Sequence, residues 1–271
     1  MEGRRNIPQA HHRRQSVREM IEVIILGSGT GVPSLRRGAP GIVIMVDSEP
    51  LLFDSGSGTL ERLLRVGIAY QDLNYVLYSH THNDHTADLG PLLFALKSTP
   101  GYTRERPLHL VGPKGFGRFV RHLLALYPWC QSERYELRVH ELMPGRLRQS
   151  DWEVSARPIA HTDASIAYRL EVGGKAIVYS GDTEMCPELI EVSKGADLLV
   201  LESSYPDGLG VKGHLTPGQA GEVAALAGAK RLVLTHFYPL CDDYDIAAQC
   251  RRTFDGELVL AQDLMRVEVS P

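Results

Sequence analysis

The sequence predicts one α/β domain with two β-sheets and helices on the outside. Short hydrophobic runs joined by polar turns come first and are typical of antiparallel hairpins, whereas later apolar runs alternate with helical patterns. No Pro-, Gly- or Ser-rich linker divides the body of the chain, so we assign residues 20–271 to a single domain. The 271 residues are 43% hydrophobic and 23% charged, which is ample for a large core.

Residues 1–19 differ from the rest of the chain. They carry several arginines and two histidines but almost no large apolar side chains. A signal peptide needs an apolar centre, which this segment lacks. We therefore expect a disordered basic tail, with a nucleic-acid-binding arm as the alternative.

The bulk properties of the chain predict a cytoplasmic protein. The formal net charge is −4, which gives no global footprint for binding a polyanion. The four cysteines show no Cys-x-x-Cys spacing and are most simply reduced thiols. No apolar run reaches membrane-spanning length, so we expect no membrane partner.

The first half begins with a hydrophobic run at 21–26 that predicts a strand. The glycine-rich segment that follows is not a dinucleotide fingerprint, because Val32 and Pro33 stand where the third glycine and the start of a helix are needed. We interpret this segment as a loop. The other elements expected in this half are strands at 42–46, 51–53, 75–79 and 108–111 and helices at 59–66, from 89 onward and at about 115–127.

The second half alternates strands and helices. Thr216 followed by Pro217 supplies an N-cap and a proline at the first helical position, which predicts a helix at 216–227. Apolar runs predict the strands. The other expected elements are strands at 135–142, 152–159, 165–171, 175–180, 198–202, 231–236 and 257–261, the last closing the chain, and a helix at 246–254.

The segment 80–85 carries the strongest chemical signal. It lies between a predicted strand and a predicted helix, on a loop where side chains can converge on one point. Three imidazoles and a carboxylate invite a divalent cation, which we expect to be zinc, with manganese or iron also acceptable. A crowded polar loop is the alternative. Four donors exceed the need of one open catalytic zinc, which indicates two metals; the donors are His80, His82, Asp84 and His85.

Three further polar residues, His161, Asp182 and His236, stand at the C-terminal ends of predicted apolar strands. This is where α/β proteins place ligand-binding groups. Each alone could be a polar loop residue, but with segment 80–85 they make five histidines and two aspartates. That set suffices for two metals about 3.5–4 Å apart that share a bridging carboxylate and hold a hydroxide between them.

These motifs resemble those of the metallo-β-lactamase-fold hydrolases over about residues 21–237. The resemblance implies an αββα four-layer sandwich of two mixed sheets with outer helices. It also implies two metal ions, a bridging role for Asp182, and a place for Asp54 behind the site, where it orients a ligand histidine. The implied ligands of one metal are His80, His82 and His161, and those of the other are Asp84, His85 and His236. The motifs are Asp54-Ser55-Gly56, segment 80–85, His161, Ser180-Gly181-Asp182-Thr183 and Thr235-His236-Phe237.

Within that superfamily the chain resembles ribonuclease Z, the tRNA 3′-processing endonuclease. The resemblance implies that His214 lies on a loop beside the metals and assists phosphodiester cleavage, and that Glu202 supports it. A surface loop histidine is the alternative for His214. The matching segments are 26–31, 112–115, His161 with 165–169, 202–204, and 213–216 with 219–220.

One interval departs from the ribonuclease Z pattern. Bacterial members of that family carry a long Gly/Pro-rich arm, which clamps the tRNA elbow, between the positions of His161 and Asp182. Here residues 162–181 have room only for a compact hairpin. We therefore expect a phosphodiesterase that acts on a small diester or a nucleic-acid end through a metal-bridging hydroxide. Asp84 would orient the nucleophile and His214 would donate a proton or hold the phosphate, with tRNA 3′ processing as the alternative.

Three other functions are alternatives. The same hydroxide could attack the carbonyl of a lactone or a β-lactam. A non-catalytic nucleic-acid-binding protein could keep the fold, although the intact ligand set argues against it. A flavodiiron-type oxidoreductase would need a flavin domain, of which the sequence shows no sign. Homodimers are common in the family, so a homodimer is a further expectation, with Tyr127 and Trp129 as candidate contacts or lid residues.

Overall fold

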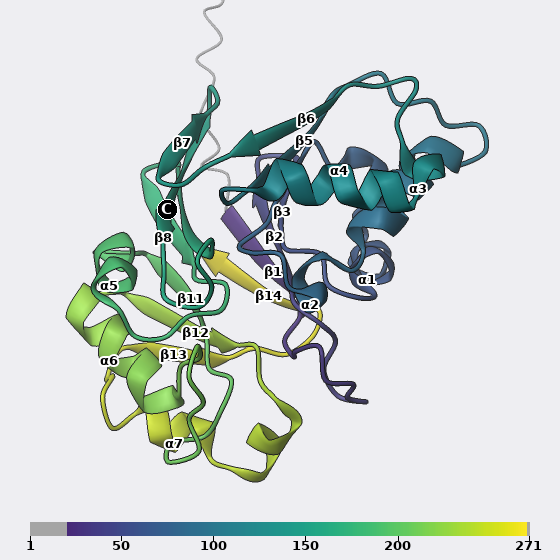
Figure 1. The fold of residues 1–271 in the computed structure, drawn as a ribbon. Helices are drawn as coiled ribbons and strands as arrows, with labels where there is room; N and C mark the ends of the chain where they lie inside the picture. Colours follow the sequence, from purple (N-terminus) through teal and green to yellow (C-terminus); the bar gives the residue numbers. More distant parts are fainter. Residues whose placement is uncertain (1–20, 270–271) are drawn as a thin grey trace, which may run out of the picture.

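Two mixed β-sheets of seven strands each face one another, and helices cover their outer sides (Figure 1). The computed structural model describes residues 21–269, so the basic tail predicted for residues 1–19 lies outside the described residues. The two-sheet arrangement with outer helices confirms the predicted fold class.

The first sheet changes from antiparallel to parallel pairing along its width. It consists of β1 (Ile21–Gly27), β2 (Gly41–Val46), β3 (Glu49–Phe53), β4 (Tyr75–Leu77), β5 (Leu108–Gly112), β6 (Leu137–Glu141) and β14 (Met265–Val269). The spatial order is β14-β1-β2-β3-β4-β5-β6. Pairing is antiparallel from β14 to β3 and parallel from β3 to β6.

The second sheet also has an antiparallel half and a parallel half. It consists of β7 (Gly145–Arg148), β8 (Trp152–Pro158), β9 (Ile166–Val172), β10 (Lys175–Tyr179), β11 (Leu198–Glu202), β12 (Arg231–Thr235) and β13 (Glu257–Leu260). The spatial order is β13-β12-β11-β10-β9-β8-β7. Pairing is antiparallel from β7 to β10 and parallel from β10 to β13.

The helices form the two outer layers. Those over the first sheet are α1 (Thr59–Arg65), α3 (Leu89–Ser98) and α4 (Phe116–Leu126), and those over the second are α5 (Pro187–Ser193), α6 (Pro217–Ala227) and α7 (Ile246–Cys250) (Figure 1). A one-turn helix, α2 (Asn83–Thr86), and the 3-10 helices η1 (Tyr70–Asp72), η2 (Pro128–Cys130) and η3 (Pro239–Asp243) complete the fold. The N-cap predicted for α6 is confirmed, because the Thr216 side chain and that of Gln219 form a capping box.

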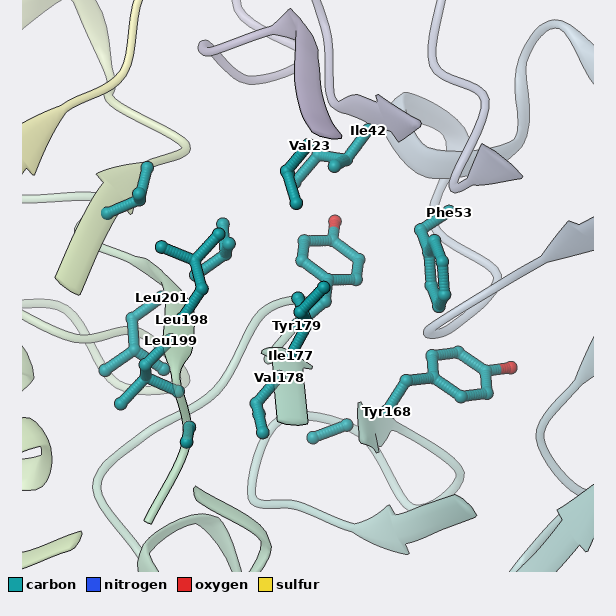
Figure 2. Close-up of a cluster of buried hydrophobic side chains, with 14 of the residues drawn as sticks. Val23, Ile42, Phe53, Tyr168, Ile177, Val178, Tyr179, Leu198, Leu199 and Leu201 are labelled. Carbon is teal, nitrogen blue, oxygen red and sulfur yellow. The ribbon is translucent and has the colours of Figure 1, made fainter. Parts of the chain in front are cut away.

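Side chains that alternate between the two faces of each strand form the central core between the sheets. Val23, Ile42 and Phe53 point from the first sheet toward Tyr168 and Ile177 of the second (Figure 2). The Phe53 ring meets the Tyr168 ring edge to face, with centroids 5.6 Å apart. Side chains on the opposite face of the first sheet form a separate core beneath its helices. Burial on both faces fixes the register of the first sheet, because a slip of one residue would exchange its two faces.

Several elements differ from the sequence prediction. The chain closes with β14 rather than with the strand expected at 257–261, and the helix expected at 246–254 ends at Cys250. The short elements β7 and α5 were missed. β7 is a four-residue polar edge strand, and α5 has only seven residues, so neither shows a clear hydrophobic period.

The parallel halves of the two sheets place the carboxyl ends of several strands at one edge of the sandwich. Asp54 follows β3, and Asp182 follows β10 by three residues. Glu202 is the last residue of β11, and His236 comes directly after β12. Parallel strands have their carboxyl ends on the same side of a sheet, so these side chains gather in one place.

Candidate metal centre

The predicted metal ligands converge at this edge of the sandwich. His82 is the N-cap of α2, and Asp84 and His85 lie within that helix, which refines the prediction of a simple loop. His80 and His161 come from the loops that follow β4 and β8. Ligand atoms lie within 4.8 Å of one another in each of three overlapping groups, namely His80, His82, His161 and Asp182; Asp84, His85 and His236; and Asp182, His214 and His236.

Asp182 lies between two sets of histidines. Its Oδ2 is 3.9 Å from Nε2 of His80 and 3.8 Å from Nε2 of His161. Its Oδ1 is 3.2 Å from Nε2 of His85 and 3.3 Å from Nε2 of His236. Each carboxylate oxygen therefore faces one set, which is the geometry that a bridging ligand needs.

The atoms at the centre fit divalent cations. Nε2 of His80, His85 and His236 and Oδ1 of Asp182 are buried and have no hydrogen-bond partner among the described residues. Buried polar atoms without partners are costly, so such a cluster indicates a ligand. Imidazole nitrogens and carboxylate oxygens together are the donors that zinc and similar borderline metals accept.

Protonation at the centre is compatible with metal binding. Burial and the neighbouring His85 hold the pKa of His80 well below its ordinary value, so this ring is a neutral donor. Burial opposes the charged form of His85 as well, but the carboxylates of Asp182 and Asp54 raise the pKa of this ring well above its ordinary value. Metal binding to histidine displaces such protons, so a cation between these groups would release one.

Asp54 is buried behind the centre and supports a histidine in each set. Its Oδ2 accepts hydrogen bonds from Nδ1 of His85 at 2.7 Å and from Oγ of Ser79 at 2.8 Å. The Ser79 oxygen lies 3.0 Å from Nδ1 of His80. Because the Ser79 hydroxyl donates to Asp54, it accepts from His80, which leaves Nε2 of His80 for a metal.

His214 and Glu202 form a pair beside the centre, at the positions that the sequence indicated. Nδ1 of His214 donates to Oε1 of Glu202 at 2.9 Å, and Glu202 is only 1% exposed. Burial opposes protonation of His214, but the hydrogen bond to Glu202 raises its pKa above the ordinary value. With Nδ1 engaged, Nε2 is the nitrogen left to meet a substrate.

Three side chains that contact the candidate ligands or Asp54 were missed by the sequence reasoning. Tyr179 donates its hydroxyl to Oδ2 of Asp54 at 2.6 Å, and Ser79 joins Asp54 to His80 as described above. Ser204 lies 2.9 Å from Nδ1 of His236 and donates to Glu202. The only available signal was position, because Ser79 directly precedes segment 80–85 and Ser204 lies two residues after Glu202.

The interval between His161 and Asp182 is the compact hairpin that the sequence predicted. Strands β9 and β10 pair in antiparallel register, from Lys175 opposite Val172 to Tyr179 opposite Tyr168. Gly173 and Gly174 form the turn, with φ of 57° and 74°, a region that favours glycine. The described hairpin therefore contains no inserted arm.

Comparisons with known proteins agree with this geometry. The beta-lactamase superfamily domain matches residues 50–237. A protein named ribonuclease Z from Mycobacterium sp. (strain KMS) is 32% identical over 282 residues, covering 93% of this chain and 97% of that protein. Another ribonuclease Z, from Methanothermobacter thermautotrophicus, is 27% identical and covers 92% of this chain and 97% of that protein.

Solved structures show the same fold. The metallo-beta-lactamase fold protein YhfI from Bacillus subtilis superposes with a TM-score of 0.81 at 25% identity, covering 92% of this chain and all of that one. Human tRNase Z, short form, has a TM-score of 0.77 at 25% identity, with the same coverage. A diphosphatase from the PhnP family has a TM-score of 0.70 at 22% identity, covering 92% of this chain and 98% of that one. Within residues 21–269, none of the helices is long and apolar enough to cross a membrane.

Proposed function

Because this chain belongs to the beta-lactamase superfamily, on the metallo-beta-lactamase fold, we propose that it is a phosphodiesterase with two divalent metal ions, most suitably zinc. The observation that carries the proposal is the Asp182 carboxylate, whose two oxygens face two separate sets of histidines. Two metals that share a carboxylate can clamp the attacking and the leaving oxygen of one phosphate.

The proposed ligands form two sets, and the distances between their side-chain atoms support this division. His80, His82 and His161 would hold one ion, and Nδ1 of His82 lies 3.1 Å from Nε2 of His161. Asp84, His85 and His236 would hold the other, and Oδ2 of Asp84 lies 3.5 Å from Nε2 of His236. Asp182 would contribute one oxygen to each ion. When bound, the metals would supply a water with a pKa near neutrality and positive charge for the phosphate oxygens.

Asp84 is held so that it can orient the attacking water. The amide of Gly31 donates to Oδ2 of Asp84 at 3.0 Å, whereas Oδ1 receives no hydrogen bond from the described residues. A Cβ at Gly31 would lie 3.0 Å from Cβ of Asp84, so a larger residue there would push the carboxylate. The first loop therefore sets the direction in which Asp84 can accept a proton from a nucleophile.

His214 would act on the leaving group. Its bond to Glu202 fixes the ring orientation and favours the protonated form, so Nε2 can donate a proton to the departing oxygen or hold a phosphate oxygen. Glu202 is itself fixed, because its Oε1 accepts from the amide of Thr183 at 2.7 Å. A rigid carboxylate behind a histidine is the usual device for orienting a proton donor.

A second candidate is cleavage at the 3′ side of tRNA. The chain spans 97% of the mycobacterial relative named ribonuclease Z, and human tRNase Z, short form, shares the fold. The tight hairpin of β9 and β10 favours a smaller diester, because it offers no surface for gripping the body of a tRNA. The relatives favour RNA, so the two candidates share one chemistry and differ in the substrate.

The chain also offers a surface for a homodimer. An apolar groove between α3 and α4 is lined by Gly90, Pro91, Phe94, Leu123, Tyr127 and Trp129. The side chains of Phe94 and Trp129 are 48% and 58% exposed. A groove lined by exposed aromatic side chains is more often a surface that binds a partner than a surface that stays in contact with solvent. We propose a second copy of the chain as its occupant.

One panel of substrates tests the proposed function. The purified protein, with its metal content measured, is assayed on bis-p-nitrophenyl phosphate, a lactone, a β-lactam and a precursor tRNA. Turnover of the diester with no turnover of the lactone or the β-lactam supports the proposal. Precise 3′ cleavage of the precursor selects the second candidate. Turnover of an acyl substrate alone overturns both.

A further inference from the structure

The backbone of Gly213 links a proposed metal ligand, His161, to the carboxylate of Glu184, to which the proposed reaction gives no role. Nδ1 of His161 donates to the carbonyl oxygen of Gly213 at 2.8 Å. The amide of the same residue, Gly213, donates to Oε1 of Glu184 at 2.7 Å. Glu184, Gly213 and His161 therefore form a chain of two hydrogen bonds that ends at a proposed ligand.

Glu184 also connects the loops around the centre through its backbone. Its amide donates to the carbonyl oxygen of Ala160 at 2.8 Å, directly before His161. Glu184 lies two residues after Asp182, and Gly213 directly precedes His214. One half-buried residue thus ties together the loops that carry the bridging carboxylate, a histidine ligand and the proton donor.

The position of Gly213 in this loop requires glycine. Gly213 has φ of 93°, a backbone region that L-residues with side chains rarely adopt. A Cβ at this position would lie 3.1 Å from Nδ1 of His161, so only glycine lets the loop approach the ring this closely. Glu184 therefore binds the peptide group before Gly213, and His161 binds the peptide group after it.

We propose that Glu184 is a positioning residue that holds His161 in its ligand orientation, and the adjacent His214 in place, through the backbone of Gly213. The inference rests on the proposed metal centre. Partners that hydrogen-bond to a ligating histidine fix the ring and typically govern metal affinity by 10–100-fold. Here the partner is the backbone carbonyl of Gly213, and the Glu184 carboxylate anchors the same residue through its amide.

Three substitutions at Glu184 separate the effect of side-chain length from the effect of charge. Glu184→Gln keeps the side-chain length and an acceptor oxygen but removes the negative charge. Glu184→Asp keeps the charge but is one methylene too short for the 2.7 Å bond. Glu184→Ala removes both. Glu188→Ala is the matched control, because Glu188 is an exposed glutamate four residues further along, at the start of α5.

The readout is cobalt binding to the metal-stripped protein, followed by its visible absorption and by calorimetry. We expect Glu184→Ala and Glu184→Asp to bind one of the two cobalt ions about tenfold more weakly, with a changed spectrum. We expect Glu184→Gln and Glu188→Ala to match the parent chain. Thermal unfolding of the metal-free variants should be nearly unchanged, because Glu184 is only half-buried.

Two outcomes would overturn the inference. One is parent-like cobalt affinity and spectrum in Glu184→Ala. The other is weak binding by Glu184→Gln together with parent-like binding by Glu184→Asp, which would assign the effect to charge rather than to the hydrogen bond. Cobalt binding is measured without any substrate, so a failure here is distinct from a failure of the proposed diesterase activity.

Discussion

Nδ1 of His85 donates a 2.7 Å hydrogen bond to Oδ2 of Asp54, and both side chains are fully buried. The bond turns Nε2 of His85 toward Oδ1 of Asp182, 3.2 Å away. Asp54 itself has φ of 55°, in the left-handed region that aspartate tolerates better than most residues. A carboxylate that stands behind the centre therefore decides the direction of a proposed ligand in front of it.

Replacing Asp54 with asparagine should weaken metal binding. Asn keeps the shape and tolerates the backbone conformation, but it loses the charge that orients His85 and, through Ser79, His80. We expect a loss of about 10–100-fold in metal affinity, measured by competition with a chromophoric chelator. The control is Asp88→Asn, because Asp88 is a buried aspartate whose carboxylate, within the described residues, accepts from the amides of Gly58 and Leu60 and contacts no histidine. Equal losses in the two variants would contradict the role given to Asp54.

Replacing His214 with alanine should separate catalysis from metal binding. A positioned proton donor contributes about 10²–10⁴-fold to a rate, so hydrolysis of bis-p-nitrophenyl phosphate should fall by that factor. Metal content, measured by elemental analysis, should stay at the parent value. His214 lies near Asp182 and His236, so a ligand role is a real competitor. Metal content that falls in step with the rate would show that His214 is a ligand and would refute its role as a donor.

Removing the Asp182 side chain should reduce metal content, which the His214 substitution should leave unchanged. Asp182→Ala takes away the group that faces both histidine sets, so the variant should lose bound metal as well as activity. Elemental analysis after dialysis against a weak chelator measures the loss. A variant that retains two metal ions per chain would show that the two sites do not depend on a shared carboxylate.

The groove between α3 and α4 gives a prediction about assembly. Trp129→Glu places a charge in the groove and should shift the protein to a monomer, as measured by light scattering after size exclusion. Leu226→Glu is the control, because Leu226 is 59% exposed on α6, outside the lining of the groove. A parent protein that is already monomeric at high concentration would refute the proposed dimer.

The positions of the candidate ligands could be predicted from the sequence because His161, Asp182 and His236 follow strand ends and the others form one cluster after β4. Apolar runs locate the strand ends, and polar residues there must face the same edge, which is how His161, Asp182 and His236 were grouped with segment 80–85. The contacts behind the ligands could not be predicted in this way. Tyr179 donates to Asp54 across 125 positions of sequence, and nothing in its apolar strand distinguishes its hydroxyl from that of a core tyrosine.

The missed elements have a similar physical cause. β14 pairs with β1 from the opposite end of the chain, with Ile21 opposite Val269. Its five residues alternate between apolar side chains and the exposed Arg266 and Glu268, a period-two pattern too short to stand out in the sequence. Short-range patterns report local structure well and long-range pairing poorly.

In the proposed reaction, the residues on either side of Asp182 would hold two metal ions that together promote cleavage of a phosphodiester. The most direct measurement titrates zinc or manganese into the metal-stripped protein while bis-p-nitrophenyl phosphate hydrolysis is followed. The predicted result is a diesterase rate that reaches its plateau only at two equivalents of metal per chain. A plateau at one equivalent, or no diesterase activity when two equivalents are bound, would contradict the claim.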